Sequence, residues 1–382
     1  MAFDASGQSV PHRLRGPALS AALDKPAARL LYLDWLRGVA VIAMVLAHSI
    51  DSWTHDADRH GEPFYTLFFI GGVASPLFLF LAGLASAMSA ASKSRRDGCH
   101  AAGARAARRR GWEIFGLGLI FRVQSQLLGM GPLQNLLKVD MLNVMGLSIV
   151  AATYLWQAMP HRRTRVIAFS LATAAVTFST PLIRAAAWLT PFPDAIEAYL
   201  RPAGALAAFP LFPWAGFLFA GALVGDLIDH RRIDLTRQSR LQLGVVVVAT
   251  LGVWLGWRAS FAPALFPAAS FWHDSPTFFF IRLGLCALTV PVAFVVERLV
   301  RPAVLMPVVT LGRSSLFVYW IHVEMVYGVI AEPIKQNLPI AIVLMGTTML
   351  TLFLYLLVLL KNRLLDRHEL RGPFKILAPV IR

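Results

Sequence analysis

Ten long apolar segments make up most of this chain, and they restrict it to one class of fold. Hydrophobic residues make up 57% of the 382 residues and charged residues only 15%, a composition that ordinary soluble domains do not have. Apolar runs of about 20 residues span a bilayer as helices. We therefore expect an all-α, polytopic integral membrane protein with about 10 transmembrane helices. The expected spans cover residues 31–52, 66–91, 111–130, 139–158, 166–189, 207–228, 241–258, 277–297, 312–331 and 339–361.

Basic residues predict the orientation of these helices. Lys and Arg number 36, and their densest group lies between the second and third apolar segments. Because cytosolic loops are enriched in Lys and Arg, we expect both termini in the cytosol and the protein in the inner (plasma) membrane. Residues 1–28 are expected to be a disordered cytosolic tail, 29–361 the membrane domain and 362–382 a basic cytosolic tail. This topology explains the formal charge of +15 without nucleic acid as a partner.

The first apolar segment carries ionisable residues at both ends. Residues 29–53 read RLLYLDWLRGVAVIAMVLAHSIDSW, and at about 1.5 Å per residue His48 lies roughly 21 Å along the helix from Asp34. The spacing favours an Asp34–Arg37 pair near one membrane face and a His48–Asp51 pair near the other. A histidine beside a carboxylate suits proton transfer. The alternative is that Arg37 is an ordinary cytosolic anchor and His48 lies in the headgroup layer.

Two later segments hold polar side chains at a depth where lipid disfavours them. His322 and Glu324 lie in the ninth segment, and His322 is about 15 Å along the helix from Gly312. They are not expected to pair, since residues i and i+2 face different sides of a helix. Arg122 falls late in the third segment, and we expect it to face the same cavity as His48. Ionisable groups at this depth favour a functional site over simple packing.

The basic residues directly before the third segment allow two interpretations. Arg108, Arg109 and Arg110 either fix orientation and contact anionic membrane lipid, or also hold the phosphates of a cytosolic donor such as coenzyme A. Arg37, with Asp34 beside it, would face the same compartment. The two cysteines suggest neither a disulfide nor a metal site.

Small residues and one proline predict how some helices pack. Gly221 and Gly225 in the sixth segment have the G-x-x-x-G spacing that favours close contact between helices. Pro76 lies inside the second segment, where a proline releases a backbone carbonyl and bends the helix. The loop after the fifth segment is expected to hold a short interfacial helix.

Several stretches together resemble a known family. They are RLLYLDWLRGVAVIAMVLAH, SPLFLFLAG, RRGWEIFGLGL, FPLFPWAGFLFAGALVGDL and LGRSSLFVYWIH. They are similar to bacterial members of the transmembrane acyltransferase superfamily, and most to proteins related to the catalytic region of heparan-α-glucosaminide N-acetyltransferase. The resemblance implies an N- or O-acyltransferase that takes an acyl group, usually acetyl, from cytosolic acetyl-CoA or another acyl-CoA. The acceptor would be a glycan or amino-sugar amine or hydroxyl at the outer face.

The resemblance also implies roles for individual residues. Arg37 matches the family's arginine, His48 the histidine expected to be the base, and His322 the histidine of the late-helix motif. The lysosomal enzymes have an asparagine where His48 falls and place their critical histidine in the following loop, so His60 is the alternative base. A nearby cation such as Arg122 would stabilise the oxyanion. We expect no metal. The resemblance leaves the acceptor open, and the oligomeric state is also open, with a homodimer among the options.

A different class of function also fits a polytopic helical protein. Ionisable residues at depth suit a secondary transporter of a small polar or anionic solute, whose site often lies between internal repeats. The first five and last five segments show no convincing similarity to each other, which disfavours this alternative. A non-catalytic scaffold would gain little from buried histidines and arginines.

Overall fold

The computed structural model describes residues 30–129, 132–204, 206–207, 209–231, 234–267 and 269–367. The predicted N-terminal tail, and residues 368–382 of the predicted C-terminal tail, lie outside these ranges. The described part of the chain contains no strand, and its two isolated β-bridges, Thr54–Leu338 and Val139–Ala207, join loops. The predicted all-α fold is confirmed.

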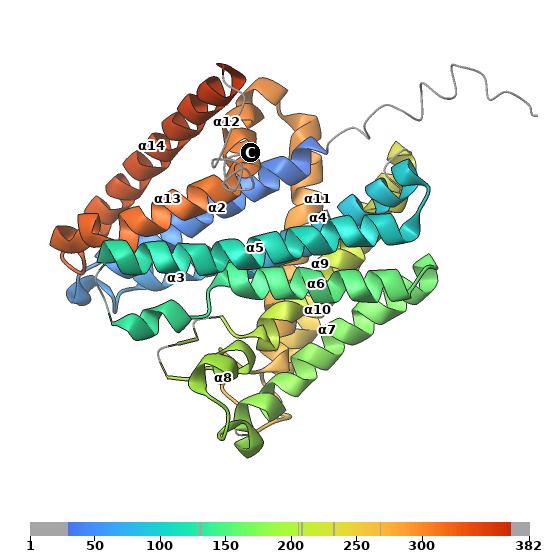
Figure 1. Cartoon of the computed structure of the whole chain (residues 1–382), viewed down its shortest axis with the longest axis horizontal. Helices are drawn as coiled ribbons and strands as arrows, with labels where there is room; N and C mark the ends of the chain where they lie inside the picture. Colours follow the sequence, from blue (N-terminus) through green and yellow to red (C-terminus); the bar gives the residue numbers. More distant parts are fainter. Residues whose placement is uncertain are drawn as a thin grey trace, which may run out of the picture. The chain divides into compact units, whose positions relative to one another are not determined.

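Each of the ten predicted apolar segments overlaps a helix or a pair of helices (Figure 1). The α-helices are α2 Leu31–Trp53, α3 Glu62–Gly72, α4 Ala74–Asp97, α5 His100–Gly129, α6 Met141–Ala158, α7 Arg162–Ala185, α8 Asp194–Leu200, α9 Leu211–Arg231, α10 Leu235–Ala259, α11 Pro276–Leu299, α12 Pro302–Arg313, α13 Ser315–Tyr327 and α14 Ile340–Arg367. The connections hold the 3₁₀ helices η1 Asp56–Asp58, η2 Leu133–Leu137, η3 Ala187–Leu189 and η4 Val329–Ile334. Helix α8 confirms the short helix predicted after the fifth segment.

Most of these helices are long and apolar enough to cross a membrane. Within the described ranges, 8 candidate spans meet this standard, namely α2, α3 with α4, α6, α7, α9, α10, α11 and α14. Helices α12 and α13, which are bent by 71° at their junction, make a ninth if the pair counts as one span. Helix α5 has 30 residues, but its first half carries the basic group. The polytopic membrane fold is confirmed, and the count of ten depends on α5 and the bent pair.

Two predicted spans are interrupted by a break. The second is divided into α3 and α4 at Val73, which follows two glycines and precedes Pro76, because neither residue type supports a helix interior. The ninth is divided between Arg313 and Ser315, so that a helix not predicted from the sequence, α12, precedes α13. Hydroxyls at this second break accept from neighbouring helices: Lys361 Nζ donates to Ser314 Oγ at 2.7 Å, and Arg37 Nη2 donates to Ser315 Oγ at 2.7 Å.

Glycines allow two helix pairs to approach at backbone distance. A Cβ atom on Gly221 would lie 1.8 Å from the carbonyl oxygen of Phe80, and one on Gly225 would lie 2.4 Å from that of Leu84. Helices α4 and α9 therefore pack directly backbone against backbone, which confirms the close contact predicted from the G-x-x-x-G spacing. Helices α2 and α12 cross in the same way, because a Cβ atom on Gly312 would lie 2.0 Å from the carbonyl oxygen of Asp34.

The buried apolar side chains form two large clusters. One joins α4, α5, α6, α7, α9 and α11, with Phe169, Phe217 and Leu218 among its fully buried members. The other joins α2, α13 and α14 around Val45 and Val318. The two clusters meet at α13 and α4: Leu316 and Tyr319 of α13 also pack against the first cluster, and Phe78 of α4 packs against the second.

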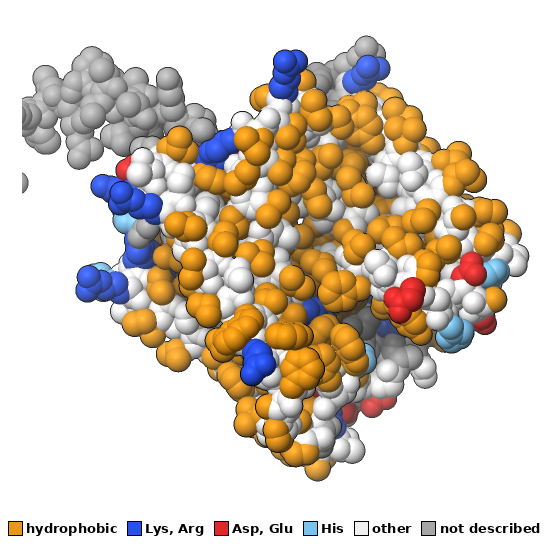
Figure 2. Space-filling model, turned by 180° about the vertical axis from the view of Figure 1, so that it is seen from behind, with side chains coloured by type: hydrophobic (Ala, Val, Ile, Leu, Met, Phe, Trp, Pro, Cys, Tyr) orange, Lys and Arg blue, Asp and Glu red, His pale blue; other side chains and the backbone are white. Residues whose placement is uncertain are grey.

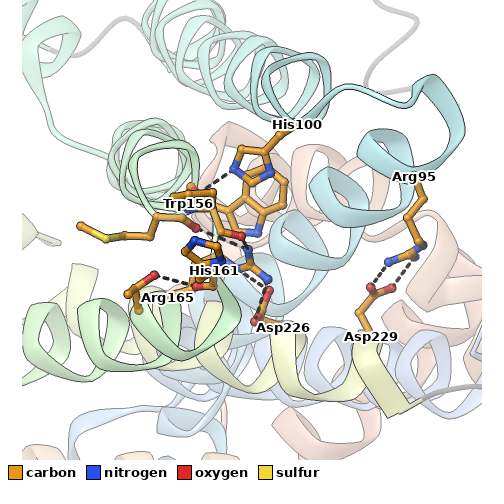
Figure 3. A network of polar contacts seen from close by, with 10 residues as sticks. Arg95, His100, Trp156, His161, Arg165, Asp226 and Asp229 are labelled. Atoms are coloured by element: carbon orange, nitrogen blue, oxygen red, sulfur yellow. Dashed lines mark hydrogen bonds and ion pairs between the residues drawn. The ribbon is translucent and has the colours of Figure 1, made fainter. Parts of the chain in front are cut away.

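One end of the helix bundle is rich in cations; we call it the basic end, formed by the start of α2, the end of α4 and the start of α5. There, two buried carboxylates of α9 hold neighbouring helices (Figure 3): Asp229 pairs with Arg95 of α4, and Asp226 accepts from Arg165 Nε of α7 at 2.9 Å. In Figure 2 most visible Lys and Arg side chains lie on one side of a hydrophobic surface, and most His, Asp and Glu side chains on the other. Which end faces the cytosol stays a prediction.

Candidate active site

A cavity of about 340 Å³ runs along the boundary between the two apolar clusters. Helices α2, α4, α5, α6 and α13 line it. Arg37 and Arg110 contribute to its wall toward the basic end, and His48 and Tyr319 contribute farther along α2 and α13. Between these groups α4 lines the cavity with small side chains, Ala82, Ala85, Ser86 and Ser89. The cavity thus has ionisable or phenolic groups toward its two ends and small side chains between them.

His48 and His322 meet side by side in this region. His48 Nδ1 lies 2.9 Å from His322 Nε2, and the two rings stack with centroids 5.0 Å apart. His322 is fully buried, and its Nδ1 lies 2.9 Å from the carbonyl oxygen of Val318 one turn earlier in α13. As predicted, His322 does not pair with Glu324; its partners are Val318 and His48.

These distances assign the protons of the neutral imidazoles. A carbonyl oxygen can only accept, so His322 Nδ1 carries a proton and donates it to Val318. His322 Nε2 then has a lone pair and accepts from His48 Nδ1. His48 Nε2 is left unprotonated on a residue that lines the cavity. A neutral imidazole held in this tautomer can take a proton from a group bound in the cavity.

Asp51 has a different partner from the one that its spacing suggested. Its Oδ2 accepts from the hydroxyl of Tyr327 at 2.8 Å, and its backbone carbonyl accepts from Arg59. The ring of Tyr327 lies against that of His48, with centroids 5.3 Å apart. Asp51 is therefore connected to the histidine pair through Tyr327, which donates to Asp51 and packs against the ring of His48. The Nδ1 atom of His48 is already hydrogen-bonded to His322.

Arg122 lies behind the cavity wall, which corrects the expectation that it faces the cavity. Its Nη2 lies 3.0 Å from Asp140 Oδ2, while Asp140 Oδ1 accepts from the hydroxyl of Tyr319 at 2.6 Å. Tyr319 lines the cavity, and Arg122 does not. Asp140 also caps the start of α6 by accepting from the Met141 N–H. This buried carboxylate pairs with Arg122 of α5 and with Tyr319, and so holds α13, the helix of His322, against α5 and α6.

The cations predicted for the donor divide into two groups. Arg37 lines the cavity, donates to Ser315, and lies 3.8 Å from Asp34, so the predicted Asp34–Arg37 pair is confirmed. Of the three consecutive arginines, Arg110 alone lines the cavity. Arg108 donates to Gln157 Oε1 at 2.7 Å and lies over the ring of Tyr154, and the side chain of Arg109 is 84% exposed. Successive helical residues point about 100° apart, so one arginine in three faces inward.

The second candidate base, His60, does not belong to the cavity wall. It is exposed in the connection between η1 and α3, and it is not among the residues that line the cavity. Within the described residues, no group of three or more His, Cys, Asp or Glu side chains is arranged to hold a metal ion. The histidine pair is therefore the group of the site best placed for acid–base chemistry.

Comparison with known proteins matches this chain to a family through most of the cavity-lining helices. The sequence model described as "Heparan-alpha-glucosaminide N-acetyltransferase, catalytic" matches residues 29–255, more than half of the chain. The chain belongs to this family. It is accordingly a membrane acetyltransferase of the heparan-α-glucosaminide N-acetyltransferase type. No curated protein matches the sequence.

The family match covers only part of the site. Arg37, His48, Arg110 and Asp140 lie within residues 29–255, whereas α13 with His322 lies beyond them. Sequence reasoning singled out His322 from its depth in an apolar helix. It did not identify Ser315 or Tyr327, because a serine at a break and a tyrosine at a helix end carry no signal of their own. Ser315 accepts a hydrogen bond from Arg37, and Tyr327 donates one to Asp51; both partners belong to α2.

Proposed function

We propose that this acetyltransferase moves an acetyl group from acetyl-CoA in the cytosol to the amine or hydroxyl of a sugar at the outer face of the inner membrane. The observation that supports this most is the continuity of one cavity from Arg37 to His48. The two residues are separated by about 16 Å along α2, at about 1.5 Å per residue. An extended pantetheine arm of about 13 bonds, each advancing roughly 1.25 Å, has the same length.

The two ends of the cavity suit the two ends of the donor. At the basic end, Arg37 and Arg110 would bind the phosphates of coenzyme A, since a guanidinium offers paired donors to phosphate oxygens. The Ser315 hydroxyl, which accepts from Arg37, would keep that side chain oriented. The small side chains of α4 leave room for the pantetheine arm. The thioester would then lie beside His48.

The proposed reaction uses the lone pair on His48 Nε2. His48 takes a proton from the acceptor amine or hydroxyl as the acceptor nitrogen or oxygen forms a bond to the thioester carbonyl carbon. The carbon–sulfur bond then breaks, and the leaving thiolate takes the proton from His48 to give free coenzyme A. Atoms and charges balance without a further reactant. The same lone pair would serve a two-step route in which the acetyl group is first carried on His48.

The function is tested by coenzyme A release from purified protein in nanodiscs. We expect the wild type to bind radiolabelled acetyl-CoA and to release coenzyme A, faster when glucosamine or mixed glycans are present, with label appearing in the acceptor. A transporter has no reason to cleave the thioester. Wild-type protein that neither binds nor cleaves acetyl-CoA under these conditions would refute the proposal and direct the next assays to solute transport.

The two neighbouring arginines of α5 provide a matched test of the donor site. Because Arg110 lines the cavity and Arg109 is exposed, Arg110→Gln should raise the KM for acetyl-CoA by about 10- to 100-fold, which corresponds to one lost charge-assisted hydrogen bond. Arg109→Gln should leave it within about twofold. Equal effects of both substitutions, measured by steady-state coenzyme A release, would show that the cations act only through general surface charge.

A further inference from the structure

Pro76 leaves a backbone carbonyl without its usual helical partner. Helices α3 and α4 form one span, and in such a span the N–H of residue 76 would donate to the carbonyl oxygen of Gly72. Proline has no N–H. A carbonyl without a donor is costly inside a membrane, so Gly72 needs a partner from elsewhere in the chain.

Arg282 of α11 supplies that partner. Its Nη2 donates to the carbonyl oxygen of Gly72 at 2.8 Å, across 210 positions of sequence. The guanidinium lies among the rings of Trp214, Phe217 and Phe278, at 5.3 to 5.9 Å from their centroids. Among the ion pairs of the described residues, none involves Arg282. A cation at membrane depth with aromatic neighbours and one backbone acceptor is a specialised arrangement.

The carbonyl that Arg282 holds belongs to the segment that lies beside His48. A Cβ atom on Gly71 would lie 2.7 Å from Cβ of Ala47, the residue directly before His48. Three residues after Gly72, Ser75 lines the cavity. The break between α3 and α4 is therefore both the support for this part of α2 and a piece of the cavity wall.

We propose that Arg282 is a positioning residue for acetyl transfer: it replaces the hydrogen bond that Pro76 removes and so fixes the α3–α4 break against α2 at His48. This inference rests on the proposed function. Arg282 does not line the cavity, so it acts through the Gly72 carbonyl and not on the substrate. Its loss should disturb the geometry around His48 and leave the phosphate-binding end unchanged, because Arg37 lies about 16 Å from His48 along α2 and Arg110 lies on α5.

The chain offers a direct rescue experiment. Arg282→Gln should lower kcat for coenzyme A release by about 10- to 100-fold, the order expected for a displacement of about 1 Å at a reacting group, with the KM for acetyl-CoA within about twofold. Pro76→Ala alone should stay close to wild type, because the carbonyl can accept from two donors. In the double variant Arg282→Gln/Pro76→Ala, the backbone N–H restored at position 76 can donate to the Gly72 carbonyl, and kcat should return to within about threefold of wild type.

A second arginine on the same helix serves as the control. Arg298 also donates to a backbone carbonyl, that of Phe294, and lies over its ring, but it is far from the break. Arg298→Gln should leave kcat unchanged. If the double variant remains as slow as Arg282→Gln while Arg282→Lys is active, the positive charge itself is required and the positioning role is refuted. Wild-type protein that releases no coenzyme A would instead refute the proposed function.

Discussion

Replacing His48 with alanine is expected to lower coenzyme A release by about 10²- to 10⁴-fold, the usual contribution of a positioned general base. The reason is the proton assignment: His48 Nδ1 donates to His322, so Nε2 of His48 carries the lone pair within the cavity. Binding of acetyl-CoA should be retained, because Arg37 and Arg110 lie toward the other end. Single-turnover release and equilibrium binding, measured on one preparation, separate the two effects.

His60 provides the matched control for this experiment. It is exposed in the connection before α3, so His60→Ala should keep coenzyme A release within about twofold of wild type. The opposite result, with His60→Ala inactive and His48→Ala active, would make His60 the base. It would also mean that the connection between η1 and α3 reaches the thioester during the reaction.

The helices of this protein were largely predictable from the local sequence. Apolar length identified the 8 candidate spans of the described residues, and the G-x-x-x-G spacing indicated that α9 packs closely against another helix, though not that this helix is α4. The Asp34–Arg37 pair followed from a separation of one helical turn. These features depend on residues near one another in the chain, which is the information that periodicity and spacing carry.

Features that depend on distant partners were not predictable in the same way. His48 was expected to pair with Asp51 one turn away, but its partner His322 is 274 positions distant. Arg122 was expected in the cavity, but Asp140 holds it behind Tyr319. For His48 a local spacing suggested a partner, and helix packing supplied a different one; for Arg122 its depth in the segment suggested the cavity, and helix packing placed it against Asp140 instead. Packing also selects Arg110 from three adjacent arginines, because it decides which side of α5 faces the cavity.

The early start of α5 has a simple local reason. The stretch HAAGARAARRR before the predicted span is rich in Ala and Arg, which are among the strongest helix formers. Nothing in it ends a helix, so α5 extends from His100 into the membrane without interruption. The basic residues predicted before the span are thereby part of the same rigid element as the cavity-lining residues Ala107 and Ile114.

His322 should be replaceable by glutamine but not by leucine. Its proposed task is to accept from His48 Nδ1 through Nε2 and so keep the lone pair of His48 on the other nitrogen. The amide oxygen of glutamine can occupy the place of Nε2, so His322→Gln should keep coenzyme A release within about tenfold of wild type. His322→Leu has no acceptor and should lose about 10²- to 10³-fold, close to the effect of removing the base. If both variants were equally inactive while still binding acetyl-CoA, His322 would have to exchange a proton itself, and the two histidines would form a proton relay.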